Sequence, residues 1–278
     1  MTLVPTREIM DAALAAARGV GAFNVIHLET AQALVAGAEL VGQAVILQIS
    51  QNCVRYHGAL EPIALGTMAI ARAVTVPVAV HLDHADDEAL IDEAIALGFG
   101  SVMFDAAHHG YDENVAATRR VTARAHDAHL YVEAELGEIS GKVGAHATGA
   151  RTDPDEARAF VESTGVDALA VAVGSSHAMT ERSATLDLEL IERLRERVSV
   201  PLVLHGSSGV PDEQLRAAIH AGVTKINVST HFNGAFTRAI RGYLTEYPLA
   251  VDSRSYLAHG REAVAVEAAR LLDLFATP

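Results

Sequence analysis

Residues 77–105 read PVAVHLDHADDEALIDEAIALGFGSVMFD, and this segment holds one copy of a unit that recurs along the chain. An apolar run at 78–81 is followed by a polar loop and by a helical pattern over 87–97. Acidic residues favour the first turn of a helix, and Gly98 favours its end. A second apolar run follows at 101–104. The segment therefore predicts a strand, a helix and a second strand.

The same alternation continues through the whole sequence. Strands are expected at 21–25, 44–49, 78–81, 101–104, 130–135, 168–173, 202–204 and 225–228. Helices are expected at 6–18, 29–40, 62–74, 87–97, 112–125, 154–163, 188–197, 212–221, 232–243 and 261–275, the first with Thr6 as its cap. Nearly continuous apolar strands are typical of a parallel sheet buried on both faces.

Eight strand–helix units in about 250 residues favour a closed barrel over an open doubly wound sheet. No G-x-G-x-x-G follows the first strand and no G-x-x-x-x-G-K-[ST] occurs, which argues against dinucleotide and P-loop folds. We predict an α/β fold: a (β/α)8 TIM barrel with an extra N-terminal helix and a C-terminal helical extension. Residues 1–278 are expected to form a single barrel domain.

Composition narrows the class of function. The chain has 278 residues with 21 Lys plus Arg and 35 Asp plus Glu, a formal net charge of −14. Such a chain has no broad positive surface for nucleic acid or an anionic membrane, so neither partner is expected. A single cysteine, Cys53, excludes an intramolecular disulfide and a thiolate-rich metal cluster. Fourteen histidines leave imidazole as the candidate metal ligand.

The N-terminal segment does not read as a targeting signal. Arg7, Glu8, Asp11 and Arg18 interrupt its apolar stretches. A signal peptide needs an apolar core of about 7–15 residues, and a membrane helix needs about 20. We therefore expect a cytoplasmic protein.

The carboxyl ends of the predicted strands carry the candidate catalytic residues, as is usual for this fold. Three ends offer a histidine: His84, His177 and His205. Three imidazoles with an open position for substrate are a common catalytic zinc arrangement. Glu135 and Asp105 are candidates for a further ligand or for orienting an imidazole. Asp83, beside His84, is the candidate general acid or base.

Small and hydroxyl residues follow strands seven and eight, where barrels often bind phosphate through backbone N–H groups. These residues are Gly206, Ser207, Ser208, Asn227, Val228, Ser229 and Thr230. Lys225 should share the inward face with Asn227 but lie deeper in the barrel. A Schiff-base role for Lys225 stays open beside a packed or ion-paired one.

Taken together, these segments resemble the class II, zinc-dependent ketose-bisphosphate aldolases, and in particular their tagatose- and fructose-bisphosphate branch. The resemblance covers nearly the whole chain. It is carried by GAFNV (21–25), PVAVHLDHADD (77–87), VEAELG (132–137), TGVDALAVAVGSSH (164–177), VPLVLHGSSGVPDE (200–213), GVTKINVST (222–230) and DSRSYL (252–257).

The resemblance implies a role for each matching residue. Asp83 corresponds to the proton donor, His84, His177 and His205 to the ligands of one catalytic zinc per subunit, and Glu135 and Asp105 to alternative metal carboxylates. Residues 206–208 and 227–230 correspond to the pocket for the phosphate of dihydroxyacetone phosphate, with Ala178 nearby. Asn24 and Ser50 correspond to positions lining the other half of the substrate. Arg254 resembles the arginine that reaches the distal phosphate from a neighbouring subunit.

The implied activity is reversible cleavage of a ketose 1,6-bisphosphate to dihydroxyacetone phosphate and an aldehyde such as glyceraldehyde 3-phosphate. The implied assembly is a homodimer or homotetramer, and a monovalent cation is left open as a second ion. The family pattern E-L-G-x-x-G-G-x-E is not kept after Glu135, where its proton-shuttling glutamate is missing and Glu138 is a candidate substitute. This departure leaves open an aldolase for another phosphorylated keto-sugar, of the inositol-catabolic deoxy-ketogluconate type, or a non-catalytic sugar-phosphate-binding relative.

Overall fold

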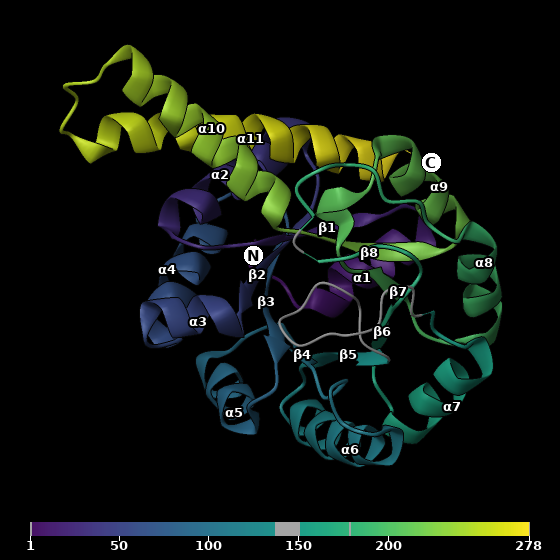
Figure 1. Ribbon diagram of the computed structural model, residues 1–278. Coiled ribbons are helices and arrows are strands. Elements are labelled where there is room, and N and C mark those ends of the chain that lie inside the picture. The colour runs from purple at the N-terminus through teal and green to yellow at the C-terminus, as the bar shows by residue number, and fades with distance from the viewer. Residues whose placement is uncertain (1, 137–150, 178, 278) are drawn as a thin grey trace.

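The structure is a computed structural model that describes residues 2–136, 151–177 and 179–277. Its eight strands are all parallel and close into a barrel in sequence order, with β8 pairing back to β1. Figure 1 shows the strands ringed by helices. The predicted (β/α)8 architecture is therefore confirmed.

The strands are β1 (Val20–Asn24), β2 (Val45–Ser50), β3 (Val78–Ala85), β4 (Ser101–Phe104), β5 (Tyr131–Leu136), β6 (Ala168–Val171), β7 (Leu202–Leu204) and β8 (Val223–Val228). The α-helices are α1 (Thr6–Ala15), α2 (Leu28–Val41), α3 (Gln51–His57), α4 (Glu61–Arg72), α5 (Glu88–Leu97), α6 (Tyr111–Asp127), α7 (Pro154–Thr164), α8 (Leu188–Arg197), α9 (Asp212–Ala221), α10 (Thr230–Glu246) and α11 (Ser253–Ala276). A 3-10 turn, η1 (Ser207–Gly209), follows β7.

The end of the barrel that holds the strand N-termini is filled with apolar side chains and covered by α1. Inward residues of the strands pack there with Ile9, Met10 and Ala13 of α1. The predicted cap at Thr6 is wrong, because Pro5 precedes the helix and no side chain caps it. The Thr6 hydroxyl instead lies 2.7 Å from the Ser101 hydroxyl and so ties α1 to β4.

Helix ends follow the local signals in the sequence. The Asp87 side chain caps α5 by accepting from the Ala89 backbone N–H at 2.9 Å, and Gly98 ends the helix with φ 80°. The other helices pack their apolar faces on the outside of the barrel. Across the described residues, no helix is both long and apolar enough to cross a membrane.

Two helices differ from the expectation. The seven-residue helix α3 was not predicted, because it has too few apolar positions to show a helical period; Ser50 caps it by accepting from the Cys53 N–H at 3.2 Å. Helix α11 begins at Ser253 rather than at residue 261, because Asp252 caps it there. β3 also continues to Ala85, past the predicted end at residue 81.

The C-terminal extension is attached to the barrel through a close contact between α2 and α11. A Cβ added at Gly37 would lie 2.6 Å from the Ala265 carbonyl oxygen and 2.7 Å from the Ala268 Cβ. The backbones of the two helices approach closely only because position 37 has no side chain. Beyond this contact, α10 and α11 project away from the barrel (Figure 1).

Substituting Gly37→Ala should destabilise the protein by about 1–3 kcal/mol, because the added methyl group forces α2 and α11 apart. Gly242→Ala is the matched control, since Gly242 also lies inside a helix and a Cβ there has nothing within 4 Å. This control should stabilise α10 by about 0.5–1 kcal/mol. Urea unfolding midpoints measure both effects, and a stabilising Gly37→Ala would contradict the close-contact argument.

Candidate active site

A cavity of about 170 Å³ opens at the carboxyl ends of the strands. Most of its wall consists of residues that the sequence predicted for the site. These are Asn24, Ser50, Asp83, His84, His177, His205, Gly206, Ser208, Asn227, Ser229 and Thr230. The strand-end rule therefore located a real pocket, and closure of the barrel brings its residues together.

Asp83 and His84 both line this pocket although they are consecutive in β3. Side chains of a regular strand alternate between faces, so two neighbours should point in opposite directions. The pairing of β3 with β4 shifts register between Leu82 and Ala85, and His84 has a left-handed backbone with φ 49°. This bulge turns the His84 side chain back toward the cavity, as bulges next to active sites commonly do.

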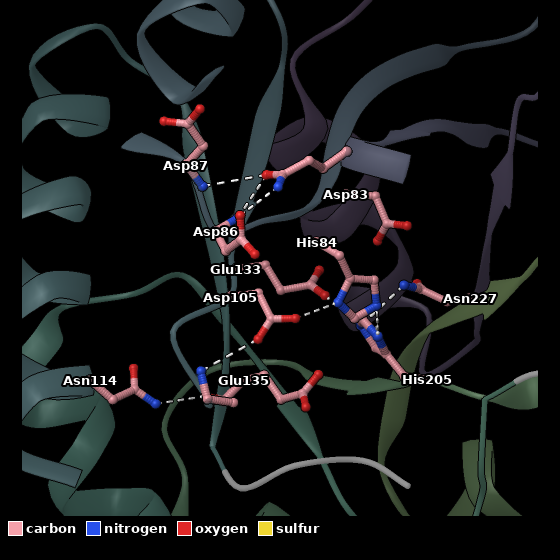
Figure 2. A network of polar contacts seen from close by, with 12 residues as sticks. Asp83, His84, Asp86, Asp87, Asp105, Asn114, Glu133, Glu135, His205 and Asn227 are labelled. Carbon is pink, nitrogen blue, oxygen red and sulfur yellow. Dashed lines mark hydrogen bonds and ion pairs between the residues drawn. The ribbon is translucent and has the colours of Figure 1, made fainter. Parts of the chain in front are cut away.

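Four side chains from different strands and loops form a candidate metal centre: His84, Glu135, His177 and His205. Each offers a ligand atom, and these atoms all lie within 4.8 Å of one another. Within this group, His84 Nε2 and His205 Nδ1 lie 2.9 Å apart (Figure 2). Three imidazoles and a carboxylate suit a divalent transition metal, so the donor set fits the predicted ion class.

Asp105 has a different place from Glu135. Its Oδ2 lies 2.8 Å from His84 Nδ1, on the side of the ring away from the cluster. A carboxylate accepts hydrogen bonds, so this contact places the imidazole proton on Nδ1 and leaves Nε2 facing His205. Of the two carboxylates that the sequence left as alternatives, Glu135 joins the cluster and Asp105 orients His84.

The Asp83 carboxylate is held from one side only. Asn24 Nδ2 donates to Asp83 Oδ2 at 2.8 Å, and Gln48 Nε2 donates to Asn24 Oδ1 at 3.2 Å. Among the described residues, Asp83 Oδ1 has no hydrogen-bond partner. The geometry thus fixes the carboxylate and leaves one oxygen for a ligand in the pocket.

The opposite wall is built from the loops that follow β6, β7 and β8. Gly206 has φ 67°, and a Cβ there would lie 2.7 Å from the Ser176 backbone. The Ser208 hydroxyl accepts from the backbone N–H groups of Ser229 at 3.3 Å and His231 at 3.1 Å. These contacts tie the loop after β7 to the beginning of α10, and the wall they form carries no acidic side chain among the described residues that line it.

Three predicted residues lie outside the cavity wall. The Ser207 hydroxyl donates to the Leu204 carbonyl at 3.0 Å, and the buried Val228 side chain lies behind the pocket wall. Arg254 lies in the first turn of α11, outside the cavity, and is paired with Asp252, the cap of that helix, at 2.7 Å. Ala178 lies outside the described residues, as does Glu138, the candidate substitute for the missing loop glutamate.

Lys225 lies beneath the pocket rather than in its wall. Its Nζ pairs with Glu133 Oε2 at 2.6 Å, and the side chain is 1% exposed. This is the packed, ion-paired lysine that the sequence left open. A Schiff-base role is not favoured, because the amine is buried and already paired.

Sequence reasoning did not assign a role to Glu133, Gln48 or Asn52. An inward position for Glu133 could have been predicted, since Glu133 lies two residues before Glu135 and so points to the same face of β5. Gln48 shares the inward face of β2 with Ser50 in the same way. Asn52 lines the cavity from α3, where its Oδ1 accepts from Arg55 Nη1 at 3.1 Å. No periodic signal marked Asn52, because α3 itself was not predicted.

A closed barrel with convergent imidazoles, a fixed carboxylate and a neutral wall of loops is typical of a metal-dependent barrel enzyme. The family described as fructose-bisphosphate aldolase class-II matches residues 4–277 of the chain. A fructose-bisphosphate aldolase of Geobacillus stearothermophilus is 40% identical over 95% of this chain and 93% of its own length. One of Giardia intestinalis is 38% identical over 95% of this chain and 90% of its own length.

Among solved structures, the YdjI aldolase of Escherichia coli K12 superposes with a TM-score of 0.87. The two sequences are 32% identical, and the match covers 98% of this chain and 97% of that one. The chain therefore belongs to the class II fructose-bisphosphate aldolase family. The predicted family and enzyme class, a metal-dependent carbon–carbon lyase, are confirmed.

The left-handed backbone at position 84 gives a stability prediction that is independent of metal binding. His84→Gly should be more stable than His84→Ala by about 1 kcal/mol, because only glycine adopts positive φ without strain. Both variants lose the imidazole, so their difference reports the backbone alone. Unfolding of both apo variants by urea measures it.

The same pair of substitutions at Asp83 is the control. Asp83 lies one residue earlier in β3 and is not among the described non-glycine residues with positive φ. There, Asp83→Gly should be less stable than Asp83→Ala by about 0.5–1 kcal/mol. If His84→Gly were also less stable than His84→Ala, the argument from the bulge at His84 would be wrong.

Proposed function

We propose that this protein reversibly cleaves a ketose 1,6-bisphosphate of the fructose or tagatose type. The products are dihydroxyacetone phosphate and glyceraldehyde 3-phosphate. The observation that carries the proposal is the arrangement of one cavity, which joins the metal cluster at His84 and His205, the fixed carboxylate of Asp83 and the neutral phosphate wall at Ser208. The names of the relatives support the same substrate class.

Zinc is the proposed ion, held by His84, His177 and His205 with Glu135 as the fourth donor. Three imidazoles and a carboxylate form a set that suits zinc. A bound zinc ion supplies Lewis-acid stabilisation of the negative charge that develops next to the ketone during cleavage. The proposal keeps a monovalent cation as a second ion and a cytoplasmic location.

Asp83 is the proposed acid–base group. Breaking the bond between C3 and C4 requires the C4 hydroxyl to lose its proton, and the reverse reaction returns it. Oδ1 of Asp83 is the oxygen available for this transfer, since Asn24 donates to Oδ2. Asn24 therefore orients the carboxylate, and Gln48 in turn orients Asn24.

The phosphate of the dihydroxyacetone half is proposed to bind at the loops after β7 and β8. Gly206, Ser208 and Ser229 line that side, and the seventeen-residue helix α10 begins there at Thr230. A helix N-terminus and backbone N–H groups attract phosphate without a charged side chain. Binding energy at the phosphate holds the reacting carbons near Asp83 and the metal ligands.

A homodimer or homotetramer is part of the proposal. The Arg254 side chain is 88% exposed, and it lies on the α10–α11 arm rather than at its own pocket. Leu249 and Val251, in the connection between these helices, are 91% and 94% exposed. An arm with exposed apolar residues and an outlying arginine suits contact with a second copy, where Arg254 reaches the distal phosphate.

A coupled assay for dihydroxyacetone phosphate over a panel of ketose phosphates tests the substrate and the metal together. Fructose and tagatose bisphosphates should be cleaved, and a deoxy-ketogluconate phosphate should be cleaved poorly. Dialysis against a chelator should abolish turnover, and added zinc should restore it. Turnover by protein shown to be metal-free would contradict the proposal, and borohydride trapping of Lys225 would then become the next test.

Mixing two variants tests Asp83 and Arg254 in one experiment. Asp83→Asn should lower kcat by about 10²–10⁴, because the amide cannot accept the hydroxyl proton. Arg254→Ala should mainly raise KM through the lost phosphate contact. After subunit exchange, each hybrid dimer has one site in which both Asp83 and Arg254 are intact. The activity of the mixture at low substrate concentration should therefore exceed the summed activities of the two parent variants.

Asp92→Asn is the matched control, because Asp92 is an exposed carboxylate on α5 that pairs with Arg124 outside the pocket. It should keep full activity. If mass spectrometry shows that the subunits have exchanged and the activity of the mixture still does not exceed the summed activities of the two parent variants, Arg254 does not act in the partner's site.

A further inference from the structure

A buried chain of charged and polar groups lies directly beneath the candidate metal centre. Glu133 Oε1 lies 2.8 Å from His205 Nε2, and Glu133 Oε2 lies 2.6 Å from Lys225 Nζ. The three side chains are 0–1% exposed and come from β5, from the residue directly after β7 and from β8. Figure 2 shows Glu133 beside the imidazoles of His84 and His205.

Stability alone does not account for this pair. Burying a carboxylate and an ammonium costs several kcal/mol per ion, and hydrophobic residues of similar volume often replace such a pair without loss. Other inward positions of this barrel are filled with aliphatic side chains, among them Ala79, Ala170 and Val203, and Val203 is the register partner of Lys225. Lys225 is also one of only two lysines in the chain.

The contacts themselves point to a role toward His205. The Glu133 carboxylate accepts a hydrogen bond, so the imidazole proton belongs on Nε2. That leaves Nδ1 of His205 to face His84 Nε2 at 2.9 Å, where the candidate ligands converge. Asn227 Nδ2 also lies 3.0 Å from His205 Nε2, but an amide nitrogen only donates, so Glu133 is the acceptor for the Nε2 proton. Lys225 holds the second oxygen of Glu133 and so keeps the first aimed at the ring.

We propose that Glu133 and Lys225 are positioning residues that fix the tautomer and orientation of His205 as a metal ligand. Asp105 does the same for His84 from the outer side. Carboxylates that orient a ligating imidazole commonly contribute about 10–100-fold in metal affinity. The inference rests on the proposed metal site, and it concerns residues that lie outside the pocket wall.

The double variant Glu133→Gln/Lys225→Met separates positioning from stability. It removes both buried charges and keeps side chains of similar size, so the fold should be about as stable as the parent or more so. Its zinc affinity should nevertheless fall by about 10–100-fold, because a neutral amide orients the imidazole less strongly than a carboxylate does. Competition with a chromophoric chelator measures affinity, and urea unfolding of the apo protein measures stability.

Cobalt substitution adds a spectroscopic readout. The visible absorption of bound Co²⁺ depends on ligand geometry, so the bands of the double variant should shift in position or intensity. Asp105→Asn is the positive control, since it removes the corresponding partner of His84. Asp167→Asn is the negative control: Asp167 pairs with Arg7 and His126 at the other end of the barrel, so it should lower stability and leave zinc affinity unchanged.

The outcomes distinguish the two proposals. If the parent protein binds no zinc, the proposed metal-dependent function fails. If the parent binds zinc and the double variant binds it equally tightly with an unchanged cobalt spectrum, Glu133 and Lys225 are only a structural pair. If the double variant does not fold, the single variant Lys225→Met takes its place. The inference is overturned if Lys225→Met lowers zinc affinity no more than Asp167→Asn does.

Discussion

The closure of eight parallel strands into one barrel is the constraint on which the site depends. Closure brings every carboxyl end to a single rim, so residues far apart in sequence, such as Asn24 and Asn227, line one cavity. The regular alternation of side chains also limits each strand to one inward residue per layer. β3 is the exception, because its bulge at His84 lets it contribute both the proposed acid–base carboxylate and a candidate metal ligand.

The cavity separates charge between its two sides. Asp105, directly after β4, and Glu133 and Glu135 of β5 lie around the imidazoles. The loops after β7 and β8 instead contribute glycine, serine and the start of α10. A chain with a net charge of −14 repels an anionic substrate at long range. The proposed phosphate site therefore lies at the neutral wall, and the carboxylates lie close to the candidate metal centre.

The barrel fold and most of the residues that line the cavity could be predicted from the sequence. The alternation of apolar strands and capped helices predicted the barrel, and the strand-end rule located Asp83, His84, His177 and His205 without any local metal motif. Other features depend on distances between strands, which one sequence does not encode locally. The division of roles between Glu135 and Asp105 is one such feature, and the partnership of Glu133 with Lys225 is another. α3 was missed because seven residues carry too short a pattern, and Asn52 was missed with it.

The apolar packing elsewhere in the barrel explains how the fold tolerates buried polar groups that cost folding free energy. At the closed end of the barrel, apolar side chains pack against α1, and the Thr6–Ser101 contact lies beside them. His81 is fully buried beside Ser101, and burial holds the pKa of His81 well below its ordinary value. Glu133 and Lys225 are also buried, at 1% exposure each, and neither lines the cavity. The outer helices and the closed end of the barrel supply the apolar burial that stabilises the fold. The buried polar groups near the cavity can therefore be selected for the geometry that they impose on the site rather than for stability.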